Sequence, residues 1–219
     1  MSFVTDSILS IVNRSSLNKP SLTNQYQVNL SGFAETGNLF ATIRERYDID
    51  RDWVINNIGI LCTEATLPTS SFATSEVKDN FQGINQQFAH TRLYVDSDFT
   101  FYVDRDYNTL KFFEGWMDFI SGGAYNKSPS NNFTSEEAQT YYRRFNYPQE
   151  YKAPVLEIIK FERSTDNNNA LKYKFFNAFP KSVGSMSVSY GQADLLKVTV
   201  TFAYDRYLFR PCTFVQGNS

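Results

Sequence analysis

The strongest constraint on the fold is an alternation of apolar and polar residues near the C-terminal end of the chain. Two segments, 183–190 and 196–205, alternate in this way on either side of a Gly-Gln-Ala-Asp turn at 191–194. A side-chain period of two, rich in β-branched and aromatic residues, is typical of half-buried antiparallel strands. The pattern therefore predicts a hairpin. Its apolar face would consist of Met186, Val188, Tyr190, Leu196, Val198, Val200, Phe202 and Tyr204.

The opposite face of this predicted hairpin is polar but carries almost no group suited to catalysis. Hydroxyl side chains predominate on it, and they indicate a lining or an assembly surface more than an active site. The residues proposed for this surface are Ser185, Ser187, Ser189, Lys197, Thr199 and Thr201.

Several other segments show strand patterns. The run near Ile58 to Cys62 is apolar on both faces, as expected of a central strand covered on both sides, and it stops at Pro68. The strand that begins at Leu171 is expected to end at Pro180, because proline has no N–H group for a β-ladder. The remaining strands are predicted at 26–33, from about 72, at 84–94, at 98–104 and at 153–162.

One helix is predicted between a cap at Asp106 and a stop at Gly122-Gly123, with Leu110, Phe113, Met117 and Ile120 on its core face. Shorter helices are predicted at 2–16 and about 134–145. We expect 36–52 to be a loop with at most a helical turn. The tail RPCTFVQGNS, from Arg210 onward, is expected to be loose.

The composition favours one mainly β domain over residues 1–219, an antiparallel β-sandwich or barrel with one flanking α-helix. Aromatic residues make up 16% of the chain, which suits β packing. A net charge of −2 argues against a strongly basic nucleic-acid-binding domain. No apolar run approaches the roughly 20 residues of a membrane span. Cys62 and Cys212 are expected to be free thiols in a reducing cytoplasm.

No catalytic, cofactor-binding or metal site is predicted. His90 is the only histidine, so neither a Ser-His-Asp triad nor a multi-histidine metal site can be assembled. Asp96, Asp98, Asp104 and Asp106 lack the spacing of a Ca²⁺ loop and are expected at solvated strand ends.

Three landmarks carry a resemblance to a known family. They are CTEATLP at 62–68, a strand ending in acidic residues before a helix with FFEGW at 112–116, and NAFPKSVGSMSVSY at 177–190 followed by LLKVTVTFAYDRY at 195–207. In this order they resemble the tail tube proteins of contractile-tailed, T4-like bacteriophages. The resemblance covers roughly 22–207, apart from insertions at about 36–56 and 122–152.

The resemblance implies a fold related to the secretion-tube protein of type VI systems. It also implies homo-hexameric rings that stack into a hollow conduit inside a contractile sheath, with genomic DNA passing through the lumen non-specifically. The other expected partners are the sheath, baseplate and tape-measure proteins. The expected location is the virion tail, assembled in the host bacterial cytoplasm. No enzymatic activity, cofactor or small-molecule substrate is implied.

Two alternatives stay open at this point: a baseplate tube-initiator protein of the same fold, and a β-sandwich module that binds a ligand or sugar. Within the tube hypothesis, the hairpin and part of 84–104 are expected to line the lumen. A Ser/Thr-rich surface would let DNA slide, because counterion release rewards only basic linings. Lys197 runs against this expectation if its side chain points inward.

Overall fold

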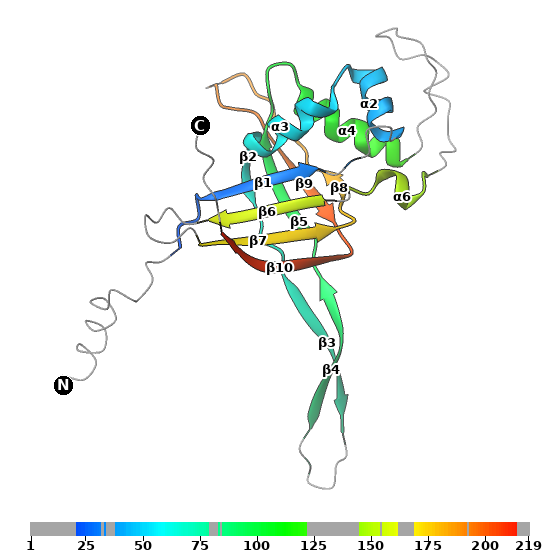
Figure 1. The fold of residues 1–219 in the computed structure, drawn as a ribbon, viewed down its shortest axis with the longest axis vertical. Coiled ribbons are helices and arrows are strands. Elements are labelled where there is room, and N and C mark those ends of the chain that lie inside the picture. Colours follow the sequence, from blue (N-terminus) through cyan, green and yellow to red (C-terminus); the bar gives the residue numbers. More distant parts are fainter. Residues whose placement is uncertain are drawn as a thin grey trace, which may run out of the picture.

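The computed structural model describes residues 21–31, 33, 38–78, 83, 85–121, 145–153, 155–161, 169–191 and 193–213. Two four-stranded antiparallel sheets pack against each other, helices gather at one end of them, and a long two-stranded hairpin projects from the other end (Figure 1). The predicted mainly antiparallel β architecture is therefore confirmed.

The first sheet has the strand order β1-β6-β7-β10, and every neighbouring pair is antiparallel. Its inward side chains include Leu156 and Ile158, which stand opposite Phe175 and Tyr173 in the register. The strand predictions for this sheet are confirmed except at the C-terminal end, where 210–213, the described part of the expected loose tail, belong to a strand. Its strands are β1 (Tyr26–Ser31), β6 (Val155–Phe161), β7 (Asn169–Phe176) and β10 (Arg206–Thr213).

The second sheet has the strand order β2-β5-β9-β8. The alternation predicted for β9 is confirmed, because Val198, Val200 and Phe202 are all buried while Lys197 and Thr199 are exposed. The strands of this sheet are β2 (Cys62–Ala65), β5 (Ser97–Tyr102), β8 (Phe179–Val183) and β9 (Lys197–Ala203).

The helices described in the structure are α2 (Asn38–Tyr47), α3 (Arg51–Leu61), α4 (Asn108–Ile120) and the single turn α6 (Pro148–Tyr151). Helix α4 begins where the Asp104 carboxylate accepts hydrogen bonds from the Thr109 backbone N–H and hydroxyl, at 2.9 and 3.0 Å. It ends where Asn146 donates to the Phe119 carbonyl at 2.8 Å. The capping carboxylate is thus Asp104 and not the predicted Asp106, because Tyr107 adopts a left-handed conformation that separates Asp106 from the first turn.

Aromatic side chains from α4 and both sheets form the core. Phe113 of α4 lies 4.9 Å from Phe101 and 6.1 Å from Phe202, measured between ring centroids. Phe99 of the second sheet contacts Phe175 of the first, edge to face, at 6.1 Å. Trp116 is fully buried, and its indole N–H donates to the Tyr151 carbonyl at 2.8 Å. The indole N–H of Trp116 is therefore satisfied inside the core.

The buried face of α4 differs from the predicted one. Leu110, Met117 and Ile120 are only half-buried, whereas Phe113 is buried as expected. The face that packs into the core is turned toward the larger aromatic side chains, which bury more apolar area per residue. It consists of Thr109, Phe112, Phe113, Gly115, Trp116 and Phe119.

The predicted C-terminal hairpin forms only in part. β8 ends at Val183, and the described residues from 184 to 196 are not in a strand. Pro180 does not end β7 but lies inside β8, opposite Phe202 and beside a register shift. Because β8 is the outermost strand of its sheet, the missing proline N–H is tolerated there.

Two further predictions are wrong in the N-terminal half. The run near Ile58 belongs mostly to helix α3, since Ile58 and Cys62 are buried at a spacing of four residues while Ile60 is 81% exposed. The segment 36–52 is not a loop, because α2 places Leu39, Phe40 and Ile43 in the core. The helices predicted at 2–16 and 134–145, and the stop at Gly122-Gly123, lie outside the described residues.

Hairpin β3–β4, called the arm below, is formed by Ser70–Val77 and Gln86–Tyr94. It is a separate two-stranded sheet whose strands pair with each other alone among the described residues. Figure 1 shows it extending away from the sandwich, opposite the helices.

Helix α3 approaches strand β1 so closely that only glycine fits at position 59, where a Cβ atom would lie 2.1 Å from the Val28 carbonyl oxygen. We expect Gly59→Ala to lower the free energy of unfolding by about 1–3 kcal/mol through overpacking. Chemical denaturation measures this. The matched control is Gly191→Ala, because a Cβ there would have no neighbour within 4 Å. Equal stability of the two variants would contradict the close approach.

The two cysteines are free, and only Cys62 is buried. Burial raises the pKa of the Cys62 thiol from 9.0 to about 12. At pH 8 iodoacetamide should therefore alkylate Cys212 in the folded protein, and Cys62 only after unfolding, as read by mass spectrometry. Because the folded pKa is the higher one, the stability that the neutral thiol contributes is present below pH 9 and is lost toward pH 12. Equally fast alkylation of both cysteines in the folded protein would contradict this.

Candidate assembly surfaces

The outer side of the second sheet carries a surface dominated by hydroxyl groups, called the threonine face below. The Thr100 and Thr199 hydroxyls are hydrogen-bonded at 3.1 Å, and the Thr201 hydroxyl donates to the Asp98 carboxylate at 2.6 Å. Antiparallel pairing of β5 with β9 brings these side chains together. The members of the threonine face are Asp98, Thr100, Tyr102, Lys197, Thr199 and Thr201.

Charge on the threonine face is balanced. On its two central strands Asp98 is the one carboxylate and Lys197 the one cation, and the edge strand β2 adds Glu64 opposite Thr100. The Lys197 ammonium lies 5.4 Å from the centroid of the Tyr102 ring, in cation–π geometry. This face therefore offers hydroxyl groups and little net charge to whatever lies against it.

The structure brings together half of the residues predicted for a polar lining. Lys197, Thr199 and Thr201 share the threonine face, whereas Ser185, Ser187 and Ser189 lie exposed in the segment between β8 and β9. The period of two in that segment predicts a strand, but no backbone group of the described residues pairs with Ser185 to Tyr190. The predicted lumen segment 84–104 contains Thr100 and Asp98 without singling them out, although their alternation with Phe99 and Phe101 indicates that they share one polar face.

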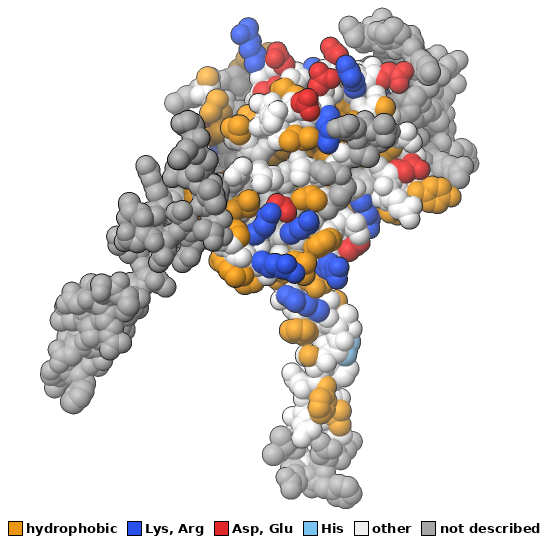
Figure 2. Space-filling model, viewed as in Figure 1, with side chains coloured by type: hydrophobic (Ala, Val, Ile, Leu, Met, Phe, Trp, Pro, Cys, Tyr) orange, Lys and Arg blue, Asp and Glu red, His pale blue; other side chains and the backbone are white. Residues whose placement is uncertain are grey.

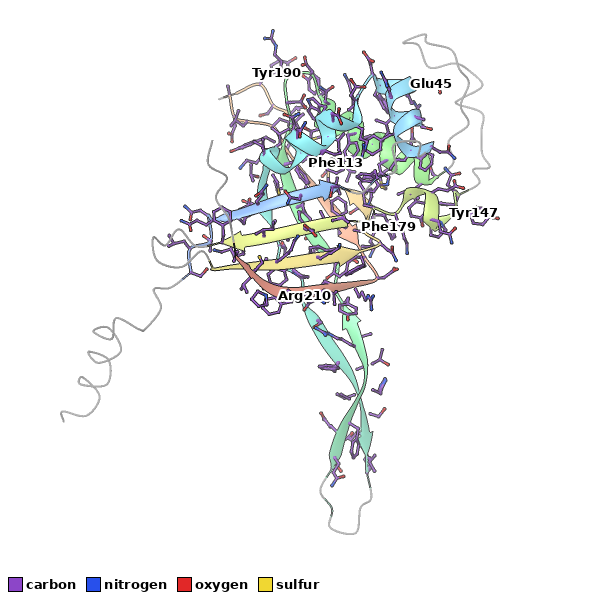
Figure 3. The ribbon with its side chains drawn as sticks, in the orientation of Figure 1. Glu45, Phe113, Tyr147, Phe179, Tyr190 and Arg210 are labelled. Atoms are coloured by element: carbon purple, nitrogen blue, oxygen red, sulfur yellow. The ribbon has the colours of Figure 1, made fainter. Side chains whose placement is uncertain are left out.

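The outer side of the first sheet is basic. The β7–β10 register places Lys172 and Lys174 on the same side as Arg206 and Arg210, and Glu157 is the one carboxylate on this side of the described strands. Figure 2 shows Lys and Arg side chains gathered over β6, β7 and β10, and Figure 3 labels Arg210 there. The net charge of the chain conceals this local excess. We call these five residues the basic face.

Contacts within the basic face leave most of its charge uncompensated. Lys172 pairs with Glu157 at 2.7 Å. Lys174 and Arg206 both lie over the Phe176 ring, at 5.6 and 5.1 Å from its centroid. Aromatic contact holds these cations in place without neutralising them, so the face attracts anionic groups.

The arm exposes apolar side chains along its length. Phe72 is 62% exposed and Phe88 is 54% exposed, and Val77 and Leu93 are also exposed. An isolated two-stranded hairpin is marginally stable in water. Apolar exposure of this kind on a projecting element marks a surface for another protein.

The root of the arm is fixed to both sheets. The Arg92 guanidinium lies over the rings of Tyr94 and Tyr207, at 5.3 and 5.5 Å, and donates to the Ser70 hydroxyl at 2.9 Å. The Tyr204 hydroxyl donates to the Val95 carbonyl at 2.6 Å, and burial raises the pKa of Tyr204 above its ordinary value. The arm therefore leaves the body in a defined direction.

The residues considered for catalysis or metal binding are placed apart. His90 is exposed on β4 and contacts the Thr91 hydroxyl. Asp96 pairs with Lys181 at 2.6 Å, and Asp104 caps α4. Within the described part of the chain, no cluster of His, Cys, Asp and Glu has the arrangement of a metal site. Of the helices described, none has the length and apolarity needed to cross a membrane.

Comparison with known proteins gives a family and a fold. A family model described as phage tail tube protein matches residues 21–210. A chain from the six-fold symmetrised baseplate of the anti-feeding prophage has a TM-score of 0.53 at 11% identity, covering 88% of this chain and 97% of that chain. A chain from the tube-terminating cap of the anti-feeding prophage has a TM-score of 0.52 at 13% identity, covering 92% and 97%. At these identities the likeness shows the fold alone. A comparison with curated protein sequences gave no match.

Proposed function

The chain belongs to the phage tail tube protein family, and on that premise we propose that it is the repeated subunit of the tail tube. In this proposal six copies form a ring, and rings stack into a hollow conduit for DNA inside a contractile sheath. The whole chain acts as one structural domain and needs no catalysis, cofactor or small-molecule substrate.

Open sheet edges support ring closure. In the second sheet β2 and β8 are the two outermost strands, so the sheet ends in unpaired backbone groups on both sides. Edges of this kind invite pairing with another chain. Head-to-tail contact between β8 of one copy and β2 of the next would continue the sheet around a ring, and such a heterologous contact closes when the rotation fits.

The observation that carries the repeated-subunit role is apolar exposure at both ends of the long axis. The arm exposes Phe72 and Phe88 at one end. Tyr190 is fully exposed at the other end (Figure 3). A subunit that stacks on copies above and below needs an adhesive surface at each end. A cap that terminates a tube needs only one for that purpose.

We assign the threonine face to the lumen and the basic face to the exterior. Neutral hydroxyl groups give DNA phosphates no counterion-release gain, so DNA slides past them. Lysines and arginines lining a channel would instead hold DNA. On the exterior, the basic face suits an acidic protein surface of the surrounding sheath. Contacts with baseplate and tape-measure proteins at the tube ends complete the proposed partners.

The assembly role is tested by negative-stain microscopy of the purified full chain over a concentration series. We expect rings or tubes with a central hole, and class averages give the ring symmetry. Gel filtration on the same samples should show the monomer giving way to large species as concentration rises. A monomer at every concentration, combined with tight binding of a sugar or small ligand, would contradict the proposal and favour a binding module.

The luminal assignment is tested with single biotin labels in a Cys212→Ser background. One variant is Thr199→Cys on the threonine face, and its matched partner is Arg210→Cys on the basic face. In this proposal the lumen opens only at the tube ends, so streptavidin cannot reach a luminal label through the tube wall. We expect it to bind both labelled monomers, but to bind along assembled tubes only in the Arg210→Cys variant.

Electron microscopy of streptavidin-decorated tubes gives the readout. Labelling of Thr199→Cys tubes at their ends alone agrees with a luminal threonine face. Decoration along the whole length of Thr199→Cys tubes would overturn the assignment, whether or not Arg210→Cys tubes are decorated.

A further inference from the structure

Between β8 and β9, Ser185 to Tyr190 have the sequence of a strand but pair with no described strand. Gly184 still donates to the Thr199 carbonyl at 2.7 Å, and the Leu196 carbonyl still accepts from Val103 at 3.0 Å. Between these two points, Ser185 to Tyr190 make no backbone–backbone hydrogen bond to any described residue. Such groups are normally paired once they leave water. The segment is therefore ready to accept a strand.

The side chains of this segment are equally unpartnered. Val188 is 85% exposed and Leu195 is 67% exposed, while Met186 alone turns toward the core. The two limbs, 184–191 and 193–196, border an open space of about 800 Å³ lined by their own residues. The limbs thus stand apart and do not close into the hairpin that their sequence predicts.

The arm lies at the opposite end of the long axis from this open segment (Figures 1 and 3). Its two strands have free outer edges, and nearly all of its side chains are exposed. In length it matches the limb 184–191, because β3 has eight residues and β4 has nine. Eight extended residues span roughly 26 Å.

We propose that the arm of one copy docks into the open segment 184–196 of the next copy, and that Ser185 to Tyr190 become a strand paired with an arm edge. This inference rests on the proposed stacking of copies. Docking pairs the backbone N–H and C=O groups at an outer edge of the arm with those of Ser185 to Tyr190. It also covers Phe72 and Phe88 of the arm with Val188, Tyr190 and Leu195 of the segment. The occupant is a second copy because the two surfaces lie at opposite ends of one chain and are both apolar.

The first test is disulfide trapping in a Cys212→Ser background. Val188→Cys is combined with a cysteine at one of several arm positions, Val77, Phe88 or His90. Within one chain the two cysteines are at opposite ends, so a bond between them joins two copies. Assembled samples should give a ladder of covalent dimers, trimers and longer species on non-reducing gels after mild oxidation, from at least one arm position.

The matched control pairs Val188→Cys with Leu208→Cys, an exposed apolar position on the outer side of the first sheet. This pair, and each single-cysteine variant, should give no ladder. Unassembled protein at low concentration should give none either. Tubes that form without a ladder from any arm position would overturn the inference while leaving the proposed function standing. A chain that stays monomeric at every concentration and binds a sugar or small ligand tightly would overturn both.

The second test reads the change of conformation directly. Amide hydrogen exchange should be fast at 185–190 in the monomer and at least 100-fold slower in tubes. Successive N–H groups of a strand point to opposite edges. Ser187→Pro and Val188→Pro each remove one N–H, so together they test pairing at either edge of the segment. Each should leave the melting temperature of the monomer unchanged, because neither N–H has a backbone partner there. At least one should abolish stacking.

Unchanged exchange at 185–190 on assembly, or normal stacking of both proline variants, would sink the inference. The arm-side control is Thr91→Ala, which shortens a polar side chain and keeps the backbone N–H. It should stack as the unmodified protein does.

Discussion

Contact between α4 and the inner side of the second sheet is the interaction on which the rest of the structure depends. Phe113 reaches Phe101 and Phe202 of the second sheet, and Trp116 also contacts Phe202, with centroids 6.1 Å apart. Because α4 follows β5 directly, Asp104 fixes both the end of that strand region and the start of the helix. The sheets can therefore present two unlike outer surfaces while sharing one aromatic interior. The threonine face and the basic face both arise because every second residue of a strand points away from the shared core.

The sequence predicts this fold best where one side of a strand is buried. Val198, Val200 and Phe202 alternate with polar residues because the core selects them, and the threonine face follows from the same register. Prediction fails where pairing decides the outcome. Ser185 to Tyr190 have the same pattern as β9, yet none of the strands that the structure describes pairs with them. The alternation of apolar and polar residues indicates which side of a strand would be buried. It does not indicate whether another strand lies beside it to pair with its backbone.

Other differences come from short apolar runs and from edges. Ile58 to Cys62 is too short to separate a helix end from a strand by periodicity alone. The predicted tail begins with Arg210 and Pro211 and is polar, yet an edge strand such as β10 accepts both a charged residue and a proline. The net charge of the chain gives no indication of the basic face. In the sequence it is indicated only by cations at alternate positions, Lys172 and Lys174, and by Arg206 and Arg210 on the strand that pairs with them. The sequence thus predicts on which side of its strand each residue of these surfaces lies. It does not predict which strands lie side by side and so bring the residues together.

The root of the arm has a mechanical consequence. The arm is continuous with β2 and β5 of the second sheet, and Arg92 ties it to Tyr207 on β10 of the first. A pull along the arm is therefore shared between the two sheets of the body. Because β3 and β4 both run along the arm and are both joined to the body at its root, such a pull stretches the two strands side by side and does not peel them apart. A slender hairpin anchored in this way transmits tension to the whole sandwich.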